Sequence, residues 1–129
     1  MATILLVDDD DSLLQVMRIM LKRAGHEVIA RSNAREGFAA ALNDKVSLII
    51  VDVMMPEVSG YELCTQLKAD PRTAHTPVLI LTALQDTPME RDYAEDAGAD
   101  AILTKPVTLD RLSKRLDELL PIGQRSTLK

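Results

Sequence analysis

The chain has 129 residues, of which 47% are hydrophobic and 27% are charged, and its net charge is -5 at pH 7. This length suits one domain with a single core, and the composition excludes a disordered chain. The acidic balance argues against nucleic-acid binding, because that function needs clustered Lys and Arg side chains. No apolar run approaches the roughly 20 residues of a membrane span, and the first residues lack a secretory signal pattern. We therefore expect a cytoplasmic protein that binds neither nucleic acid nor membranes.

Five short apolar runs alternate along the chain with segments of helical periodicity. The run Leu48–Val51 is apolar throughout, which is typical of a strand buried on both faces of a parallel sheet. The other expected strands are residues 3–7, 27–31, 78–81 and 101–104. Alternation of this kind favours parallel strands joined by right-handed crossovers, with helices on both faces of the sheet. The expected class is therefore a doubly wound α/β domain.

Five helices are expected to connect and follow these strands. They cover residues 11–24, 33–43, 59–70, 87–98 and 109–120. Asp11 or Ser12 is expected to cap the first helix, and Ser59 and Thr87 each begin a capping box. The fourth helix carries few large apolar residues, so its anchoring should be the loosest. We expect one domain over residues 1–121, with residues 122–129 as a tail or the start of a linker.

The first and third helices carry apolar residues whose burial can be predicted from their spacing. Five residues of the first helix are expected to face the core: Leu13, Met17, Met20, Leu21 and Ala24. Val16 and Ile19 widen this face, which indicates either deeper burial of the helix, the commoner case, or a surface for a partner. Cys64 lies between apolar residues of the third helix, with no His at a suggestive spacing. We interpret it as a buried, inert thiol.

Charged and polar residues follow four of the five strands at the point where each strand ends. These residues are Asp8 and Asp9, Asp52, Thr82, and Lys105. Parallel strands present their carboxyl ends at one edge of the sheet, where open α/β folds bind ligands. Two like charges about 4 Å apart repel by about 4 kcal/mol at an effective dielectric near 20. One Lys cannot balance three carboxylates, so we expect Mg²⁺, a cation that prefers oxygen ligands.

A carboxylate held beside Mg²⁺, an ammonium group and a hydroxyl can attack a phosphoryl group, because these groups neutralise charge on the transferring oxygens. Asp52 would then become an acyl phosphate. Taken singly, each residue has an ordinary explanation, since a strand-end Asp or Thr is often a cap and a Lys before Pro is usually solvated. Their joint placement at matching strand ends favours the functional interpretation.

These residues also resemble a known family. Four motifs, in the family's order and spacing over residues 3–120, are similar to the receiver domain of two-component response regulators: Val7-Asp8-Asp9, Asp52-Val53-Met54-Met55-Pro56 with Gly60, Thr82-Ala83 and Lys105-Pro106. The resemblance implies a flavodoxin-like sheet of five strands in the order 2-1-3-4-5, with five helices. It also implies phosphorelay signalling, with transfer from the phosphohistidine of a histidine kinase onto the domain.

The resemblance assigns a role to each matching residue of the metal site. Asp9 and Asp52 resemble direct Mg²⁺ ligands, together with the backbone carbonyl of Met54, and Asp8 resembles a ligand that acts through water. Met54 and Leu84 are apolar where they should flank the phosphoryl group. They offer no group that could position an attacking water, so the acyl phosphate is expected to be long-lived.

The family's other roles concern the phosphoryl group itself. Asp52 resembles the phosphoacceptor, Thr82 the switch hydroxyl that moves to bond the phosphoryl oxygens, and Lys105 the ammonium group that pairs with them. One departure is Ile102, which stands where the family usually has Tyr or Phe. An aliphatic side chain has less area and no polar tip, so we expect this departure to affect transmission of the switch to the fourth helix and last strand and not phosphorylation itself.

The expected function is a signal-dependent binding module that takes part in its own phosphorylation and dephosphorylation, rather than an enzyme. Its expected partners are a sensor histidine kinase or phosphotransfer protein and an unknown output partner or domain; homodimer formation is open. Partner binding should use the first helix or the surface of the fourth helix, last strand and fifth helix.

Two alternatives share parts of this pattern. A haloacid dehalogenase-like, Mg²⁺-dependent phosphohydrolase would use the same Asp nucleophile, but it needs an acid/base Asp where Met54 stands. A flavodoxin-like nucleotide binder would need a Gly-rich loop after the first strand, and residues 8–11 are instead four aspartates that would repel phosphates.

Overall fold

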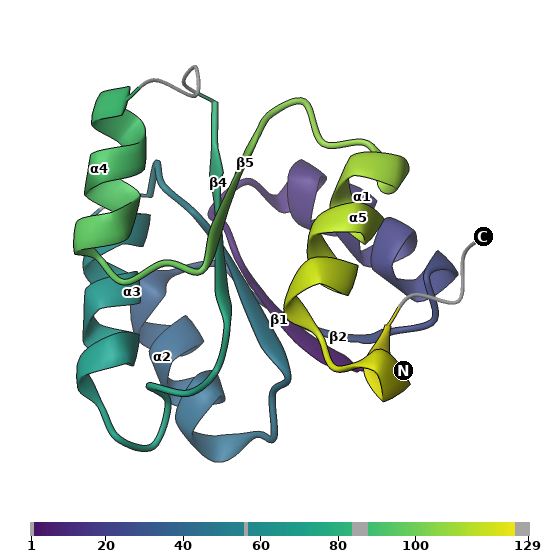
Figure 1. The fold of residues 1–129 in the computed structure, drawn as a ribbon, viewed down its shortest axis with the longest axis horizontal. Helices are drawn as coiled ribbons and strands as arrows, with labels where there is room; N and C mark the ends of the chain where they lie inside the picture. Colours follow the sequence, from purple (N-terminus) through teal and green to yellow (C-terminus); the bar gives the residue numbers. More distant parts are fainter. Residues whose placement is uncertain (1, 56, 84–87, 126–129) are drawn as a thin grey trace.

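The computed structural model describes residues 2–55, 57–83 and 88–125 (Figure 1). Within these residues, five strands alternate with five α-helices, and a short 3-10 helix follows. The elements are β1 (Thr3–Val7), α1 (Asp11–Arg23), β2 (Glu27–Arg31), α2 (Ala34–Asn43), β3 (Leu48–Asp52), α3 (Gly60–Ala69), β4 (Val78–Thr82), α4 (Pro88–Asp96), β5 (Ala101–Thr104), α5 (Leu109–Leu119) and the 3-10 helix η1 (Ile122–Gln124). The alternating pattern predicted from the sequence is confirmed.

The five strands form one parallel sheet in the order β2-β1-β3-β4-β5, which confirms the expected topology. Strand β3 is central and every one of its residues is buried, as its uniformly apolar sequence predicts. In the register of the sheet, Val51 pairs with Val7 on one side and with Ile80 on the other. The ends of β1, β3 and β4 therefore lie at the same edge.

Helices cover both faces of the sheet. Helices α1 and α5 lie on one side, and α2, α3 and α4 lie on the other (Figure 1). Because successive side chains of a strand point to opposite faces, Ile50 packs into the core under α1 and α5, whereas Ile49 and Val51 pack into the core under the other three helices. Two aliphatic cores thus hold the sheet from both sides.

The start of α1 differs from the sequence-based expectation. Its cap is Asp10, whose side chain accepts a hydrogen bond from the Leu13 backbone N–H, and not Asp11 or Ser12. The Asp10 backbone N–H donates to Asp8 Oδ1 at 2.9 Å, which holds Asp10 in the extended conformation that a cap requires. The Ser59 cap is confirmed by its bond from the Glu62 N–H, and Thr87 lies outside the described residues.

The apolar face of α1 is narrower than predicted. Val16 and Ile19 are 47% and 61% exposed, so the commoner of the two alternatives, deeper burial, is wrong. The helix packs against the sheet mainly through Leu14, Met17 and Leu21. The predicted Leu13 and Met20 are partly buried and pack against the same core, whereas the burial of Leu14 was not predicted. Among the described residues, no element covers the outer side of α1, which leaves an apolar surface there.

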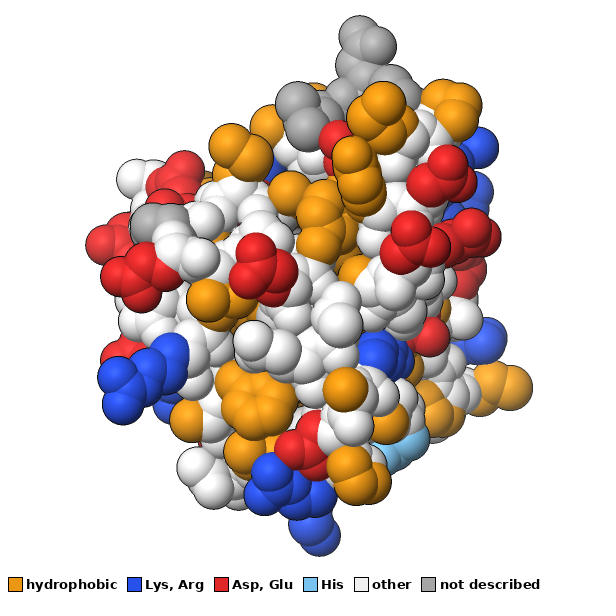
Figure 2. Space-filling model, turned by 90° about the vertical axis from the view of Figure 1, so that its left-hand side faces the viewer, with side chains coloured by type: hydrophobic (Ala, Val, Ile, Leu, Met, Phe, Trp, Pro, Cys, Tyr) orange, Lys and Arg blue, Asp and Glu red, His pale blue; other side chains and the backbone are white. Residues whose placement is uncertain are grey.

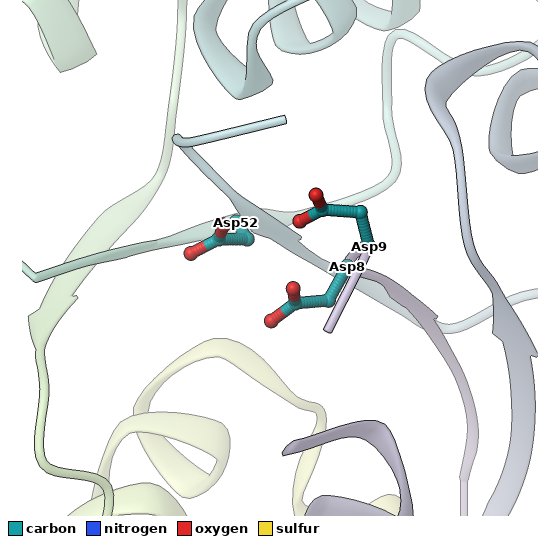
Figure 3. A group of neighbouring side chains, drawn as sticks. All are labelled: Asp8, Asp9 and Asp52. Atoms are coloured by element: carbon teal, nitrogen blue, oxygen red, sulfur yellow. The ribbon is translucent and has the colours of Figure 1, made fainter. Parts of the chain in front are cut away.

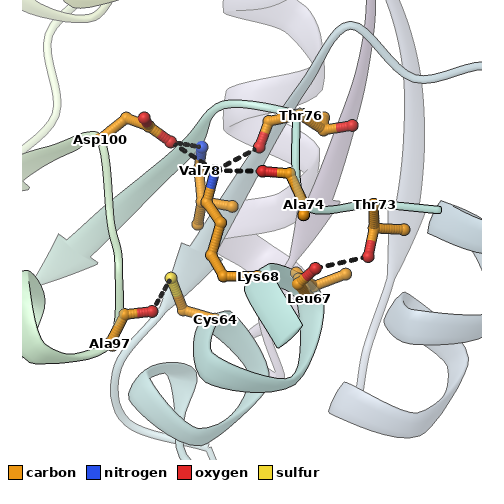
Figure 4. Close-up of polar contacts among 9 residues, drawn as sticks. All are labelled: Cys64, Leu67, Lys68, Thr73, Ala74, Thr76, Val78, Ala97 and Asp100. Atoms are coloured by element: carbon orange, nitrogen blue, oxygen red, sulfur yellow. Dashed lines mark hydrogen bonds and ion pairs between the residues drawn. The ribbon is translucent and has the colours of Figure 1, made fainter. Parts of the chain in front are cut away.

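A polar network connects α3 to the start of β4 (Figure 4). It lies at the edge formed by the amino-terminal ends of the strands. Lys68 Nζ donates to the carbonyls of Ala74 and Thr76 and lies 2.9 Å from a carboxylate oxygen of Asp100. The same Asp100 oxygen accepts a hydrogen bond from the Val78 N–H. These contacts fix the chain where it enters β4.

Cys64 is completely buried in this part of α3, as predicted. Its thiol donates to the Ala97 carbonyl at 3.3 Å, and burial raises the pKa of the thiol to about 11. A thiol with a raised pKa is a poor nucleophile at neutral pH. The structure therefore agrees with the interpretation of Cys64 as a buried, inert thiol.

Helix α4 has the fewest buried residues of the five α-helices. In α4, Ala94 is the single buried residue, in agreement with the predicted loose anchoring. Beyond α5, Ile122–Gln124 forms a turn of 3-10 helix where the sequence suggested a tail. None of the helices in the described part of the chain has the length and apolar character needed to cross a membrane.

His26 offers a test of the packing between α1 and β2. It is buried, its Nδ1 accepts a hydrogen bond from the Ala2 N–H at 3.1 Å, and burial lowers its pKa from the ordinary 6.5. The folded protein therefore favours neutral His26, and the stability that this provides is lost as the pH falls below 6.5. We expect His26→Asn to flatten the fall in unfolding free energy between pH 7 and 5, measured by urea denaturation.

The exposed His75 supplies the control, because His75→Asn should leave the slope unchanged. Asp8, whose pKa is raised to about 6, makes the unfolding free energy rise as the pH falls. The same contribution is present in wild type and in His26→Asn, so the difference between their slopes isolates the contribution of His26. Equal slopes for wild type and His26→Asn would contradict this assignment.

Candidate functional site

The strand ends place the predicted site residues at one edge of the sheet. Asp52 is the last residue of β3 and Thr82 the last residue of β4, whereas Asp8 directly follows β1 and Lys105 directly follows β5. In the register of the sheet, Asp52 pairs with Leu81, which puts Thr82 one residue further along the neighbouring strand. The parallel topology thus gathers residues that are far apart in the sequence.

Three carboxylates point into a common space at this edge (Figure 3). One oxygen from each of Asp8, Asp9 and Asp52 lies within 4.8 Å of the others. Asp8 and Asp52 are each 3% exposed, whereas Asp9 is exposed to solvent. This cluster, expected from the sequence, has the spacing and the oxygen donors that suit a hard divalent cation.

Asp8 carries the clearest sign of unbalanced charge. Its Oδ1 accepts a hydrogen bond from the Asp10 N–H, but Oδ2 is buried and has no hydrogen-bond partner among the described residues. Burial, and to a smaller degree the charge of Asp52, raises the pKa of Asp8 to about 6. A buried carboxylate oxygen without a partner is costly, and a cation at this position would remove that cost.

Lys105 provides one compensating charge. Its Nζ lies 2.8 Å from Asp52 Oδ1, and the two side chains are 25% and 3% exposed. Burial alone would lower the pKa of Lys105, but the hydrogen bond and charge of Asp52, with Asp8 and Asp10, outweigh it and raise the pKa. Lys105 is therefore an ammonium group at neutral pH. Its backbone N–H donates to the Thr82 carbonyl at 2.8 Å, which joins the ends of β5 and β4.

Gly60 has a role at the site that the sequence did not reveal. A Cβ atom on this residue would lie 2.2 Å from the Asp52 carbonyl oxygen, so any other residue would push the backbones apart. The Gly60 N–H also donates to the Val53 carbonyl at 3.0 Å. Sequence reasoning placed Gly60 at a turn and in the motif, but the close approach of α3 to Asp52 needs the tertiary structure.

The remaining predicted residues differ in their exposure. Thr82 is completely buried, and Met54 is 65% exposed on the segment that follows β3. Ile102 is partly buried and packs against the core under α2, α3 and α4. Leu84, the second residue predicted to flank the site, lies outside the described residues.

Comparison with known proteins identifies the family. A family model, described as "Response regulator receiver domain", matches residues 4–117. The fold and the acidic edge therefore define a signalling domain of the phosphorelay type. The chain belongs to the receiver domains of two-component response regulators.

Two relatives illustrate the range of proteins that contain such a domain. The "DNA-binding dual master transcriptional regulator RpaA" of Synechocystis sp. is 38% identical over 120 residues, which cover 93% of this chain and 49% of RpaA. Protein PilH of Pseudomonas aeruginosa is 33% identical over 120 residues, which cover 93% of this chain and 98% of PilH. The chain thus spans about half the length of the first relative and nearly all of the second.

Solved structures agree with this family. The chemotaxis protein CheY4 of Vibrio cholerae superposes with a TM-score of 0.88 at 33% identity, covering 93% of this chain and 99% of CheY4. The receiver domain of the sensor histidine kinase PA1611 of Pseudomonas aeruginosa has a TM-score of 0.81 at 26% identity, covering 92% of this chain and 96% of that domain. That structure holds a magnesium ion coordinated in its active site cleft. The haloacid dehalogenase-like alternative receives no support.

The unbalanced charge of Asp8 leads to a stability prediction. We expect Asp8→Asn to raise the unfolding free energy at pH 7 without Mg²⁺ by about 2–3 kcal/mol, because a shift of roughly two pKa units costs about 1.4 kcal/mol per unit. The Asn side-chain oxygen keeps the bond from the Asp10 N–H. Added MgCl₂ should stabilise wild type more than Asp8→Asn. Urea denaturation with and without MgCl₂ measures both effects.

The exposed Asp44, directly after α2, provides a matched control, and Asp44→Asn should change neither quantity appreciably. An Asp8→Asn variant less stable than wild type in metal-free buffer would show that Asp8 is not under electrostatic strain.

Proposed function

We propose that Asp52 is the phosphoacceptor of this receiver domain. The observation that carries the proposal is the position of its carboxylate, which is buried between the carboxylates of Asp8 and Asp9 and the ammonium group of Lys105, 2.8 Å away. Such an arrangement holds a nucleophilic oxygen in place and surrounds it with groups that can balance the charge of a phosphoryl group.

The acidic cluster fits Mg²⁺. Asp9 and Asp52 would hold the ion directly, with the backbone carbonyl of Met54, and Asp8 would hold it through water. The buried, unpartnered Asp8 Oδ2 and the excess of carboxylates over ammonium groups support this assignment. When bound, Mg²⁺ would neutralise negative charge that builds up on the transferring phosphoryl oxygens.

The proposed reaction is a direct phosphoryl transfer. A carboxylate oxygen of Asp52 forms a new bond to phosphorus, and the P–N bond of the donor's phosphohistidine breaks, with its electron pair returning to the imidazole nitrogen. Lys105 stays protonated, because its pKa is raised, and pairs with a phosphoryl oxygen. The phosphoryl group carries a charge of about -1.5 to -2 and replaces the single negative charge of the Asp52 carboxylate, so the net gain in negative charge is roughly 0.5 to 1. Its oxygens would draw the Thr82 hydroxyl and Lys105 inward.

The proposed donor is a sensor histidine kinase or a phosphotransfer protein, and the proposed location is the cytoplasm. The exposed apolar side chains of Val16 and Ile19 make α1 a suitable surface for the donor, as the sequence suggested. The module would control an output partner or domain through its phosphorylation state. Its part in chemistry would be limited to its own phosphorylation and dephosphorylation.

Labelling tests the phosphoacceptor directly. With acetyl phosphate and Mg²⁺, we expect wild type to gain 80 Da per chain, the mass of one phosphoryl group, by intact mass spectrometry. Asp52→Asn should gain nothing, because an amide is not a nucleophile toward phosphorus. The exposed Asp44, in Asp44→Asn, serves as the control and should be labelled like wild type. Equal labelling of Asp52→Asn would overturn the proposal.

The lifetime of the acyl phosphate tests the role of Met54. Its exposed thioether offers no strong hydrogen-bond donor or acceptor to position an attacking water. We predict that Met54→Asn shortens the lifetime by roughly tenfold, the effect of one added hydrogen bond of about 1.4 kcal/mol in the transition state. The time course of label loss after removal of acetyl phosphate measures it. Val16→Asn, an exposed substitution on α1, controls for general effects, and an unchanged lifetime in Met54→Asn would refute the prediction.

A further inference from the structure

An apolar surface lies where α3 and α4 meet. Met89 and Tyr93 of α4 are 63% and 51% exposed. Tyr61 of α3 is partly buried beside them, and its ring centroid lies 5.8 Å from that of Tyr93. These side chains bring large apolar groups together at the surface, whereas scattered single exposed residues would need no explanation.

Acidic side chains share this surface. Met89, Asp92, Tyr93 and Asp96 follow one another at the spacing i, i+3, i+4 and i+7, which places them on one face of α4. We call these four residues and Tyr61 the α3–α4 face. Figure 2 views this side of the molecule and shows a column of hydrophobic side chains in its upper part, with acidic side chains on both sides.

The acidic residues in the middle and last turn of α4 are not placed to stabilise the helix, unlike Glu90 in its first turn. Glu95 and Asp96 lie in its last turn, which contains no basic residue, although the negative end of the helix dipole disfavours carboxylates there. Asp92 and Asp96 are also like charges at i and i+4, a destabilising pair. A cationic partner would relieve both costs.

We propose that the α3–α4 face binds a basic amphipathic helix of a partner protein. The apolar side chains of that helix would cover Met89 and Tyr93, and its Lys or Arg side chains would lie against Asp92 and Asp96. A second copy of the same face would bring like charges together, which argues against a symmetric dimer at this surface. The binding of such a helix is argued from the exposure and charge of the face alone. Only its assignment as the output partner rests on the proposed function.

The α3–α4 face is also connected to Asp52. Gly60, which lies against the Asp52 carbonyl, directly precedes Tyr61 in the first turn of α3. The Tyr61 hydroxyl donates to a carboxylate oxygen of Glu90 in α4. The backbone at Asp52 is thus joined to α4 through the contact with Gly60, the peptide bond from Gly60 to Tyr61, and the hydrogen bond from Tyr61 to Glu90. A rearrangement at Asp52 would therefore reach the partner's binding surface.

The composition of the chain supplies a reporter for this surface. The chain contains two tyrosines and no tryptophan, and both tyrosines belong to the α3–α4 face. Tyrosine emission of the intact protein therefore reports on this face alone. The probe is a synthetic amphipathic helical peptide of Lys, Leu and Ala, which contributes no emission. A peptide with Glu in place of each Lys is its control.

We expect the Lys peptide, and not the Glu peptide, to change the tyrosine emission in a saturable way. Asp92→Lys/Asp96→Lys should weaken binding at least about tenfold, since it replaces attraction by repulsion. Glu27→Lys/Asp44→Lys makes the same change in net charge at exposed sites on other elements and should weaken binding less than about twofold. Met89→Ser, which keeps both tyrosines, should also weaken binding about tenfold through lost apolar burial.

Several results would overturn the proposal: equal binding of both peptides, equal weakening by the two double variants, or no effect of Met89→Ser. Self-association detected by sedimentation and abolished by Asp92→Lys/Asp96→Lys would assign the face to a second copy instead. Circular dichroism and the urea midpoint of each variant establish that it is folded before binding is measured.

The connection to Asp52 is tested separately. Acetyl phosphate with Mg²⁺ should change the tyrosine emission of wild type and leave that of Asp52→Asn unchanged. An unchanged emission in a protein that mass spectrometry shows to be labelled would overturn the connection while leaving the phosphoacceptor role intact. Absence of labelling would instead count against the proposed function, and the peptide result would stand by itself.

Discussion

The structure depends on the burial of two carboxylates, those of Asp8 and Asp52, beside one ammonium group at the edge of a parallel sheet. Burial of like charges is unfavourable unless cations and hydrogen bonds compensate for it. Lys105 and the Asp10 N–H supply part of that compensation, and the raised pKa of Asp8 shows that it is incomplete. A cation bound at the site would complete the compensation. Without it, the rest of the domain must be stable enough to keep the two carboxylates buried.

That stability comes from the two central strands of the sheet. Strands β3 and β4 are buried along their whole length between two aliphatic cores, so the ends of these strands have little freedom to move apart. Gly60 allows α3 to begin directly against the Asp52 backbone. The contrast with α4, which buries one residue, separates a rigid site from a helix that can respond to it.

If Asp52 is phosphorylated as proposed, two routes would lead from the site toward α4. One runs through Thr82 and β5, where Ile102 provides a partly buried aliphatic side chain without a polar tip. The other runs through Gly60 and Tyr61 to Glu90, and it combines a close backbone contact, a hydrogen bond and a ring contact with Tyr93. The second route has specific polar and aromatic partners in this chain, so under our proposal α3 would couple the site to the surface.

The succession of strands and helices and the members of the acidic edge were predictable, because apolar runs and strand-end residues are local features of the chain. The strand order was expected from the resemblance to the receiver family. Three features were not: the cap of α1 is Asp10 because Asp8 holds its N–H, Gly60 packs against the Asp52 carbonyl, and Val16 and Ile19 are exposed. The sequence by itself determined which elements form and which charged side chains their ends carry. Only the tertiary structure decided how deeply each side chain is buried and what it contacts, because that depends on which other elements pack over it, and periodicity does not specify those neighbours.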